Sequence, residues 1–164
     1  MIFSKKKYFS NFFGGFVFMI GDSIASILSD DFSFFRAVCV FLLGVFLYAF
    51  EIQLFFNWID KFIKRFKKQK VKKRLIKATI VLLYFNPLWI ARHLCLLMLF
   101  SGKFFQINFS LLKIGLLSFL INIPISVLAN YYIQNKILLK DRFVASTLFS
   151  GLMAIYYSMS SQWF

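Results

Sequence analysis

Residues 61–77 read KFIKRFKKQKVKKRLIK, and this stretch holds ten of the chain's twenty Lys and Arg residues. A segment this cationic cannot enter the hydrocarbon core of a bilayer, because buried charges are unfavourable there. The chain on both sides of it is long, apolar and rich in Phe and Leu, which is typical of helices that cross a membrane. The sequence therefore predicts an all-α integral membrane protein whose basic stretch stays in water.

The composition supports a polytopic membrane protein formed by a single domain over residues 1–164. Hydrophobic residues make up 60% of the chain and its mean hydropathy is +0.75, which is more apolar than a soluble domain requires. The net charge of +14 would suggest nucleic acid in a soluble protein, but here the positive charge lies mainly between apolar segments. Anionic membrane lipid is therefore the expected partner, and we expect no nucleic-acid binding.

The apolar segments predict a transmembrane helix bundle of four to five spans. Pro87 and Pro124 lie inside the third and fourth segments, where a missing backbone donor predicts a kink or a break. The five candidate segments are residues 9–28, 34–58, 78–100, 107–133 and 143–163.

Apolar residues recur at helical spacing within and just before the basic stretch. Ile59, Phe62, Ile63 and Phe66 would share one face of a helix, with Lys and Arg between them. This pattern predicts a basic amphipathic helix on the membrane surface that binds anionic headgroups. The expected headgroup-binding residues are Lys61, Lys64, Arg65, Lys67, Lys68, Lys70, Lys72, Lys73, Arg74 and Lys77.

Basic residues between the five segments fall almost entirely on one side. The amino terminus carries three, the second loop ten and the fourth loop three, whereas the opposite side carries one. Because cytoplasmic loops retain Lys and Arg, this asymmetry predicts an amino terminus inside and a carboxyl terminus outside. A four-span arrangement would break the alternation.

Small residues form stripes on the first and last segments, with one member every four positions. Such stripes let two helix backbones approach closely in lipid, so we expect both segments to pack inside the bundle. The first stripe is Gly21, Ala25 and Ser29, and the second is Ser146, Ser150, Ala154 and Ser158.

Ionisable side chains inside the apolar segments are the candidate functional residues. Asp22, Arg36, Arg92 and Lys113 are expected at one level near the outer surface, and Glu51 in the opposite leaflet. Charges at such depth must be paired or hydrated, so these groups should face the bundle interior. One interpretation is a polar path that favours small anionic solutes. The other is an Asp22–Arg36 ion pair that holds the first hairpin together, with Arg92 and Lys113 reaching toward the surface.

The sequence contains no arrangement that indicates an enzyme. His93 is the only histidine, and no carboxylate or thiol stands at metal-ligand spacing from it. We find no nucleophile–base arrangement, phosphate-binding loop or paired carboxylates in the pattern of residues. Neither catalysis, a cofactor nor a metal site is expected.

Two parts of the chain carry motifs found together in one family of membrane proteins. The first part contains Gly21-Asp22, Arg36, Gly44 and Ile59-Asp60-Lys61, and the second contains Pro124, Asn130-Tyr131-Tyr132, Arg142, Tyr156 and Ser158. Together they resemble the Mpv-seventeen and twenty-two-kilodalton peroxisomal membrane protein family. The second-span cluster of that family is replaced here by Ala49-Phe50, Gln53 and Phe55-Phe56.

The resemblance implies a small helical protein, usually drawn with four spans, that gives channel-like passage to small solutes. The expected function is thus channel-like passage of small anionic solutes across the mitochondrial inner membrane, with a bacterial inner membrane or a peroxisome as other locations. The alternative is a non-catalytic accessory subunit of a respiratory or ATP-synthase complex. Such a subunit would pack helices, bind lipid, and contact other membrane subunits or further copies of itself.

Overall fold

The computed structural model describes residues 5–64, 70–85 and 87–163, which form helices and short connections without a strand. An all-α fold is therefore confirmed. The elements are α1 Lys5–Leu28, α2 Phe34–Leu42, the π-helical segment η1 Leu43–Tyr48, α3 Ala49–Lys64, α4 Lys70–Tyr84, α5 Pro87–Phe100, the 3-10 helix η2 Phe104–Gln106, α6 Ser110–Lys136 and α7 Arg142–Trp163.

Four helical segments of the described chain are long and apolar enough to cross a membrane. They are Phe9–Leu28, Phe34–Lys64, Lys70–Phe100 and Ser110–Lys136. The 22-residue α7 runs beside them, and the side chains of its last turns lie outside the described residues. A polytopic helix bundle of four to five spans is therefore confirmed.

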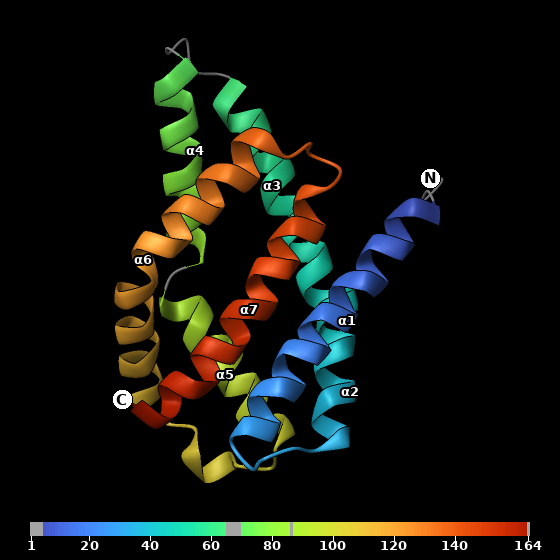
Figure 1. The fold of residues 1–164 in the computed structure, drawn as a ribbon, viewed down its shortest axis with the longest axis vertical. Helices are drawn as coiled ribbons and strands as arrows, with labels where there is room; N and C mark the ends of the chain where they lie inside the picture. Colours follow the sequence, from blue (N-terminus) through green and yellow to red (C-terminus); the bar gives the residue numbers. More distant parts are fainter. Residues whose placement is uncertain (1–4, 65–69, 86, 164) are drawn as a thin grey trace.

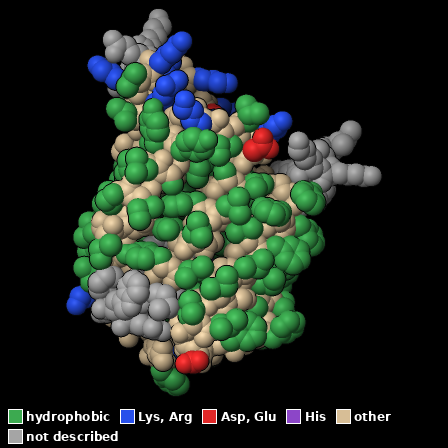
Figure 2. Space-filling view, in the orientation of Figure 1, with side chains coloured by type: hydrophobic (Ala, Val, Ile, Leu, Met, Phe, Trp, Pro, Cys, Tyr) green, Lys and Arg blue, Asp and Glu red, His purple; other side chains and the backbone are tan. Residues whose placement is uncertain are grey.

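Helix α1 runs down, α2 to α3 run up, α4 to α5 run down, α6 runs up and α7 runs down, so the connections between these passes lie alternately at opposite ends of the bundle (Figure 1). The end of α3, the start of α4 and the α6–α7 connection lie at the same end as the amino terminus, and the carboxyl terminus lies at the other. Lys and Arg side chains gather at that first end, while hydrophobic side chains cover most of the visible face below it (Figure 2). We refer to it as the basic end. The predicted grouping of the basic loops therefore agrees with the fold.

The amphipathic pattern around residue 60 does not form a separate surface helix among the described residues. Helix α3 continues through Lys64, and Ile59 and Ile63 are buried against the rest of the bundle. Residues from Lys70 onward already belong to α4. The surface-helix prediction was wrong in this part of the chain because an apolar stripe among lysines can pack on protein as readily as on lipid. Phe66 lies outside the described residues.

The π-helical segment η1 keeps one stripe of the second span directed at the core. Val40, Gly44, Tyr48, Ile52 and Phe56 are all buried and recur every four residues. Four residues of an α-helix advance about 40° beyond a full turn, so such a stripe would otherwise wind away from its partners. The wider π turn offsets this drift. As a result, Tyr48 and Ile52 are both 0% exposed.

Both prolines interrupt their helices in the way the sequence predicts. Helix α4 ends at Tyr84 and α5 begins at Pro87, so the third apolar segment is split. A proline at the first helical position needs no hydrogen-bond partner for its nitrogen. Pro124 lies inside the continuous α6, which changes direction about halfway along its length (Figure 1).

Helices α1 and α7 pack together more extensively than any other pair of described elements, so both segments lie inside the bundle as expected. They lie side by side in Figure 1. At their crossing, Gly21 of the first stripe meets Gly151 of α7, which lies one position after Ser150 of the predicted second stripe. The contact therefore uses a neighbouring face of α7. A Cβ atom placed on Gly21 would lie 2.6 Å from the backbone oxygen of Gly151. Neither backbone can move away locally, so the close approach of α1 and α7 depends on the absence of a side chain at Gly21.

Gly21→Ala is expected to lower the free energy of unfolding by about 1–3 kcal/mol, because the added methyl group forces the two helices apart. Denaturant unfolding of the purified protein in detergent measures this change. Ile24→Ala is the matched control, since Ile24 is 42% exposed on the outer face of the same helix. Equal stability of Gly21→Ala and the parent protein would contradict the backbone contact.

Candidate functional site

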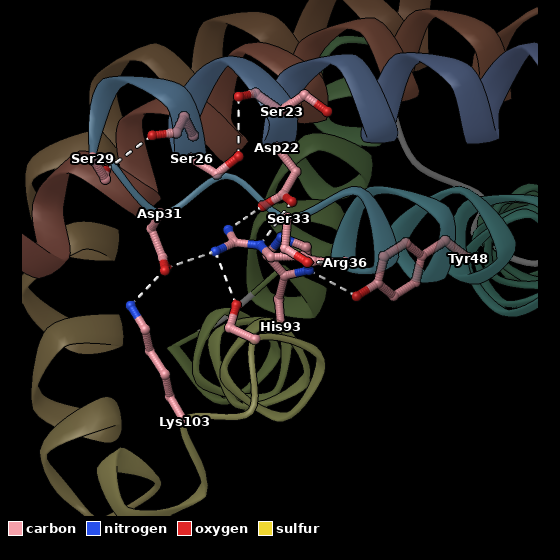
Figure 3. A network of polar contacts seen from close by, with 12 residues as sticks. Asp22, Ser23, Ser26, Ser29, Asp31, Ser33, Arg36, Tyr48, His93 and Lys103 are labelled. Carbon is pink, nitrogen blue, oxygen red and sulfur yellow. Dashed lines mark hydrogen bonds and ion pairs between the residues drawn. The ribbon is translucent and has the colours of Figure 1, made fainter.

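Asp22 and Arg36 form a buried, two-pronged ion pair between α1 and α2 (Figure 3). The Arg36 Nε atom donates to Asp22 Oδ2 at 2.9 Å, and Nη2 donates to Asp22 Oδ1. Arg36 Nη1 also reaches Asp31 and the Ser101 hydroxyl, both at 3.2 Å, and Lys103 pairs with Asp31 at 2.7 Å. These five residues, here named the Asp22 cluster, balance two carboxylates with two cations. The predicted Asp22–Arg36 pair is confirmed.

Glu51 and Arg92 pair with each other, although the sequence placed them in opposite leaflets. Arg92 Nη2 donates to Glu51 Oε2 at 2.8 Å, and the Tyr84 hydroxyl donates to the other carboxylate oxygen. The depths expected from the sequence assumed straight helices. The break at Pro87 redirects the chain, and the long Arg92 side chain covers the remaining distance. The separate placement of Glu51 and Arg92 was therefore wrong.

The five charged side chains of the predicted polar path do not line one common route. Arg36 and Arg92 each face a carboxylate. Lys113 is exposed on α6, on the outside of the bundle. A surplus of buried positive charge along one path is therefore not assembled from these residues.

A second ionic group, named the Asp60 cluster, joins four helices at the basic end. Asp60 of α3 accepts from Lys77 of α4 and from Arg142 Nη1 of α7, the latter at 2.7 Å. Arg142 Nε donates to the Ile137 carbonyl at 3.0 Å, and Lys77 Nζ donates to the Gln134 carbonyl of α6 at 3.2 Å. Lys77 and Arg142 are both 8% exposed. One carboxylate thus neutralises two buried cations only in part.

Lys77 does not face the headgroup region, because its ammonium group lies in the Asp60 cluster. Its inclusion among the headgroup-binding residues was wrong. Lys73 is partly exposed, while Arg65, Lys67 and Lys68 lie outside the described residues. The basic side chains that remain exposed and fit the prediction are Lys61, Lys64, Lys70, Lys72 and Arg74.

A stripe of neutral polar residues on α6 faces the bundle interior, and the sequence reasoning missed it. Its members recur every four residues and are 0–8% exposed. At about 1.5 Å per residue the stripe covers about 24 Å, most of the hydrocarbon thickness of about 30 Å. None of the described residues hydrogen-bonds the side-chain amide of Gln134. The stripe, named the α6 polar stripe, consists of Ser118, Asn122, Ser126, Asn130 and Gln134.

An interior cavity lies against the middle of this stripe, between α1, α4, α5, α6 and α7. It has room for about two water molecules. The Tyr48 hydroxyl hydrogen-bonds His93 Nδ1 at 2.8 Å and so fixes the ring that lines one wall. Aromatic and aliphatic side chains complete the lining. The polar lining residues are His93, Ser126, Asn130, Ser146 and Ser150.

The described residues offer no cluster of three or more His, Cys, Asp or Glu side chains that could hold a metal ion. The polar groups lining the cavity are hydroxyls, an amide and an imidazole, and the rest of the lining is aromatic and aliphatic. Such groups can exchange hydrogen bonds with water or with a small polar molecule. They provide sites for transient binding and carry no full charge when the histidine is neutral.

Comparisons with protein-family models, with curated proteins and with solved structures give no match for this chain. The resemblance to the Mpv-seventeen family therefore stays a prediction that rests on the quoted residues. The α6 polar stripe and the interior cavity are the observations from which a function can be inferred.

Proposed function

We propose that this protein is a channel-like integral membrane protein that passes small polar solutes along the α6 polar stripe. The observation that supports this most directly is the burial of five neutral polar side chains, one per turn, in a helix long enough to span a membrane. Polar groups inside a bilayer are costly and concentrate along solute pathways. The competing explanation is that they only join helices through hydrogen bonds.

The solute class follows from the charge of the lining. The sequence suggested small anions, on the basis of three cations facing one carboxylate. In the structure Arg36 and Arg92 are paired with carboxylates and Lys113 lies outside, so this reason for anion selectivity is lost. We propose small uncharged solutes with several hydrogen-bonding groups. The cavity is narrow in the described state, which we regard as closed, and passage requires it to widen.

Solute flux into proteoliposomes that contain the purified protein alone tests this function. We expect glycerol and urea to enter these vesicles faster than protein-free vesicles, as measured by light scattering after a concentration jump. Asn130→Leu should reduce the flux to the protein-free level, because Asn130 lines the cavity and is 3% exposed. Leu128→Phe is the matched control, since Leu128 is 72% exposed on the opposite face of α6.

Two results would contradict the proposal. One is the absence of protein-dependent flux of any small solute. The other is flux that Asn130→Leu and Leu128→Phe affect equally, because the polar stripe would then serve only to pack helices.

The identity of the membrane that holds this protein is proposed only on the resemblance to the Mpv-seventeen family. We place the protein in the mitochondrial inner membrane, with a bacterial inner membrane or a peroxisome as alternatives. Fractionation of cells that express the tagged protein would decide among them.

The alternative function is that of an accessory subunit in a larger membrane complex. An aromatic face on α2, η1 and α3 favours it, because Phe34, Phe35, Phe46 and Phe50 are each at least 66% exposed. Such a face can pack on a partner helix as well as on lipid. Gentle detergent extraction followed by native-size separation distinguishes the two functions. Recovery as a monomer or a small homo-oligomer would argue against the subunit.

A further inference from the structure

A second hollow opens at the basic end, between α1, α3 and residues 139–144. This basic-end cleft has a volume of about 720 Å³. Its lining mixes aromatic rings such as Phe13 with polar groups, including Asn57 and Lys140. It is therefore far larger and more open than the interior cavity.

The cleft and the cavity follow one another along the same two helices. On α1, Phe13 lines the cleft and Phe18 lines the cavity. On α7, Phe143 lines the cleft, and Ser146 lines the cavity one turn later. On both helices the residue that lines the cleft and the residue that lines the cavity are thus only a few positions apart.

Phe143 lines the basic-end cleft and belongs to the same buried cluster as Phe18, which lines the interior cavity. Its side chain is packed against Gly14 of α1, and the residue is only 3% exposed. A Cβ atom on Gly14 would lie 2.7 Å from Cε1 and from Cζ of the ring, so the ring occupies the space that glycine leaves. The Phe143 ring therefore packs directly on the backbone of α1, in the space that a side chain at position 14 would occupy.

The Asp60 cluster holds the Phe143 ring in place. Arg142 directly precedes Phe143, and it pairs with Asp60 of α3 while donating to the Ile137 carbonyl. These two contacts fix the first turn of α7 relative to α3 and α6. Arg142 and Phe143 are neighbours in the chain, so loss of these contacts would loosen the turn that carries the Phe143 ring.

We propose that the basic-end cleft is the entrance for solute and that Phe143 is the barrier between this entrance and the interior cavity. The inference rests on the proposed channel-like function, and it adds the side from which solute enters and the residue that controls access. The barrier itself can be tested without any measurement of transport.

The test uses Ser146→Cys as a reporter inside the cavity, in a chain whose Cys39 and Cys95 are replaced by Ala. A charged, membrane-impermeant thiol reagent is added to either side of membrane vesicles of known sidedness. Ser146 is 2% exposed, so slow labelling is expected while Phe143 is present. With Phe143→Ala added, we expect labelling from the basic side to become about ten-fold faster or more, because access no longer waits for rare local opening. Labelling from the opposite side should not change.

Two further variants make the test decisive. Phe50→Ala removes the same ring from a position that is 66% exposed, and it should leave the labelling rate unchanged. Gly14→Ala displaces the Phe143 ring without removing it and should also speed labelling, so it decides the matter if Phe143→Ala fails to fold. Unchanged labelling in the folded variants, or equal acceleration from both sides, would overturn the barrier.

The outcomes also separate the barrier from the proposed function. Faster labelling with no solute flux in any variant would support the barrier and contradict channel-like passage. Solute flux in the parent protein with labelling that is indifferent to Phe143 would support the function and contradict the barrier.

Discussion

Asp22→Asn should lower the free energy of unfolding by about 3–5 kcal/mol, because it leaves the buried Arg36 charge without its main partner. The side chains of Asp22 and Arg36 are only 2% and 6% exposed, so water cannot replace the lost carboxylate. Asp31 remains within 3.2 Å of Arg36 and limits the loss, but its side chain is 29% exposed and already pairs with Lys103. Denaturant unfolding in detergent, followed by tryptophan fluorescence, measures the effect.

A double-mutant cycle distinguishes a stranded charge from lost packing. Asp22→Leu and Arg36→Leu together should cost much less than the sum of the two single changes, because neither charge is then left alone in the bundle. Asp30→Asn is the matched control, since Asp30 is exposed and Asn tolerates its positive φ of 51°. Additive losses in the cycle would show that the two side chains act independently.

The features that the sequence predicted correctly depend on local or averaged properties. Length and hydropathy identify spans, Pro87 and Pro124 interrupt helices by removing a backbone donor, and a stripe containing Gly21 allows close approach whichever helix is the partner. The Asp22–Arg36 pair could also be predicted from the sequence, because the two residues flank a short connection. No long-range information is needed for any of these.

The features that were missed or wrong depend on how helices are placed in three dimensions. Glu51 and Arg92 are 41 positions apart on different helices, so their spacing in the sequence gives no sign of the contact. Lys77 looked like a surface cation because its partner Asp60 lies on another helix. The α6 polar stripe was overlooked because three apolar residues separate each polar one, so averaged hydropathy hides it. A search for polar residues every four positions would have found it.

Four residues that carry the family resemblance also form ion pairs between helices. Asp22, Arg36, Asp60 and Arg142 supply the central ion pairs of the two clusters, one on each side of the interior cavity along the bundle. The same residues therefore explain the geometry without any appeal to a family. The resemblance stays a prediction, and the contacts give a physical reason why these positions would need these side chains.

Asp60→Asn is expected to lower the free energy of unfolding by about 3–5 kcal/mol, at least as much as Asp22→Asn, because it leaves two buried cations without a carboxylate. Lys77 and Arg142 would then lie close together with no countercharge from α3, and their repulsion adds to the cost of burial. Lys77→Met should cost much less, since Asp60 keeps Arg142 as its partner and the methionine fills the same space. The free energy of unfolding of both variants is measured in detergent.

Asp141→Asn is the matched control for this prediction, because the structure shows no ion pair between Asp141 and the described residues. Equal losses for Asp60→Asn and Lys77→Met would mean that one pair, and not the shared carboxylate, stabilises the basic end. Adding Lys77→Met to Asp60→Asn should recover part of the stability, since only one cation is then left unpaired.

If this double mutant folds, a Cys placed at position 146 in it should react faster with the thiol reagent, because Asp60 no longer holds Arg142 and the first turn of α7. The Asp60 cluster would thus couple the stability of the basic end to access past Phe143.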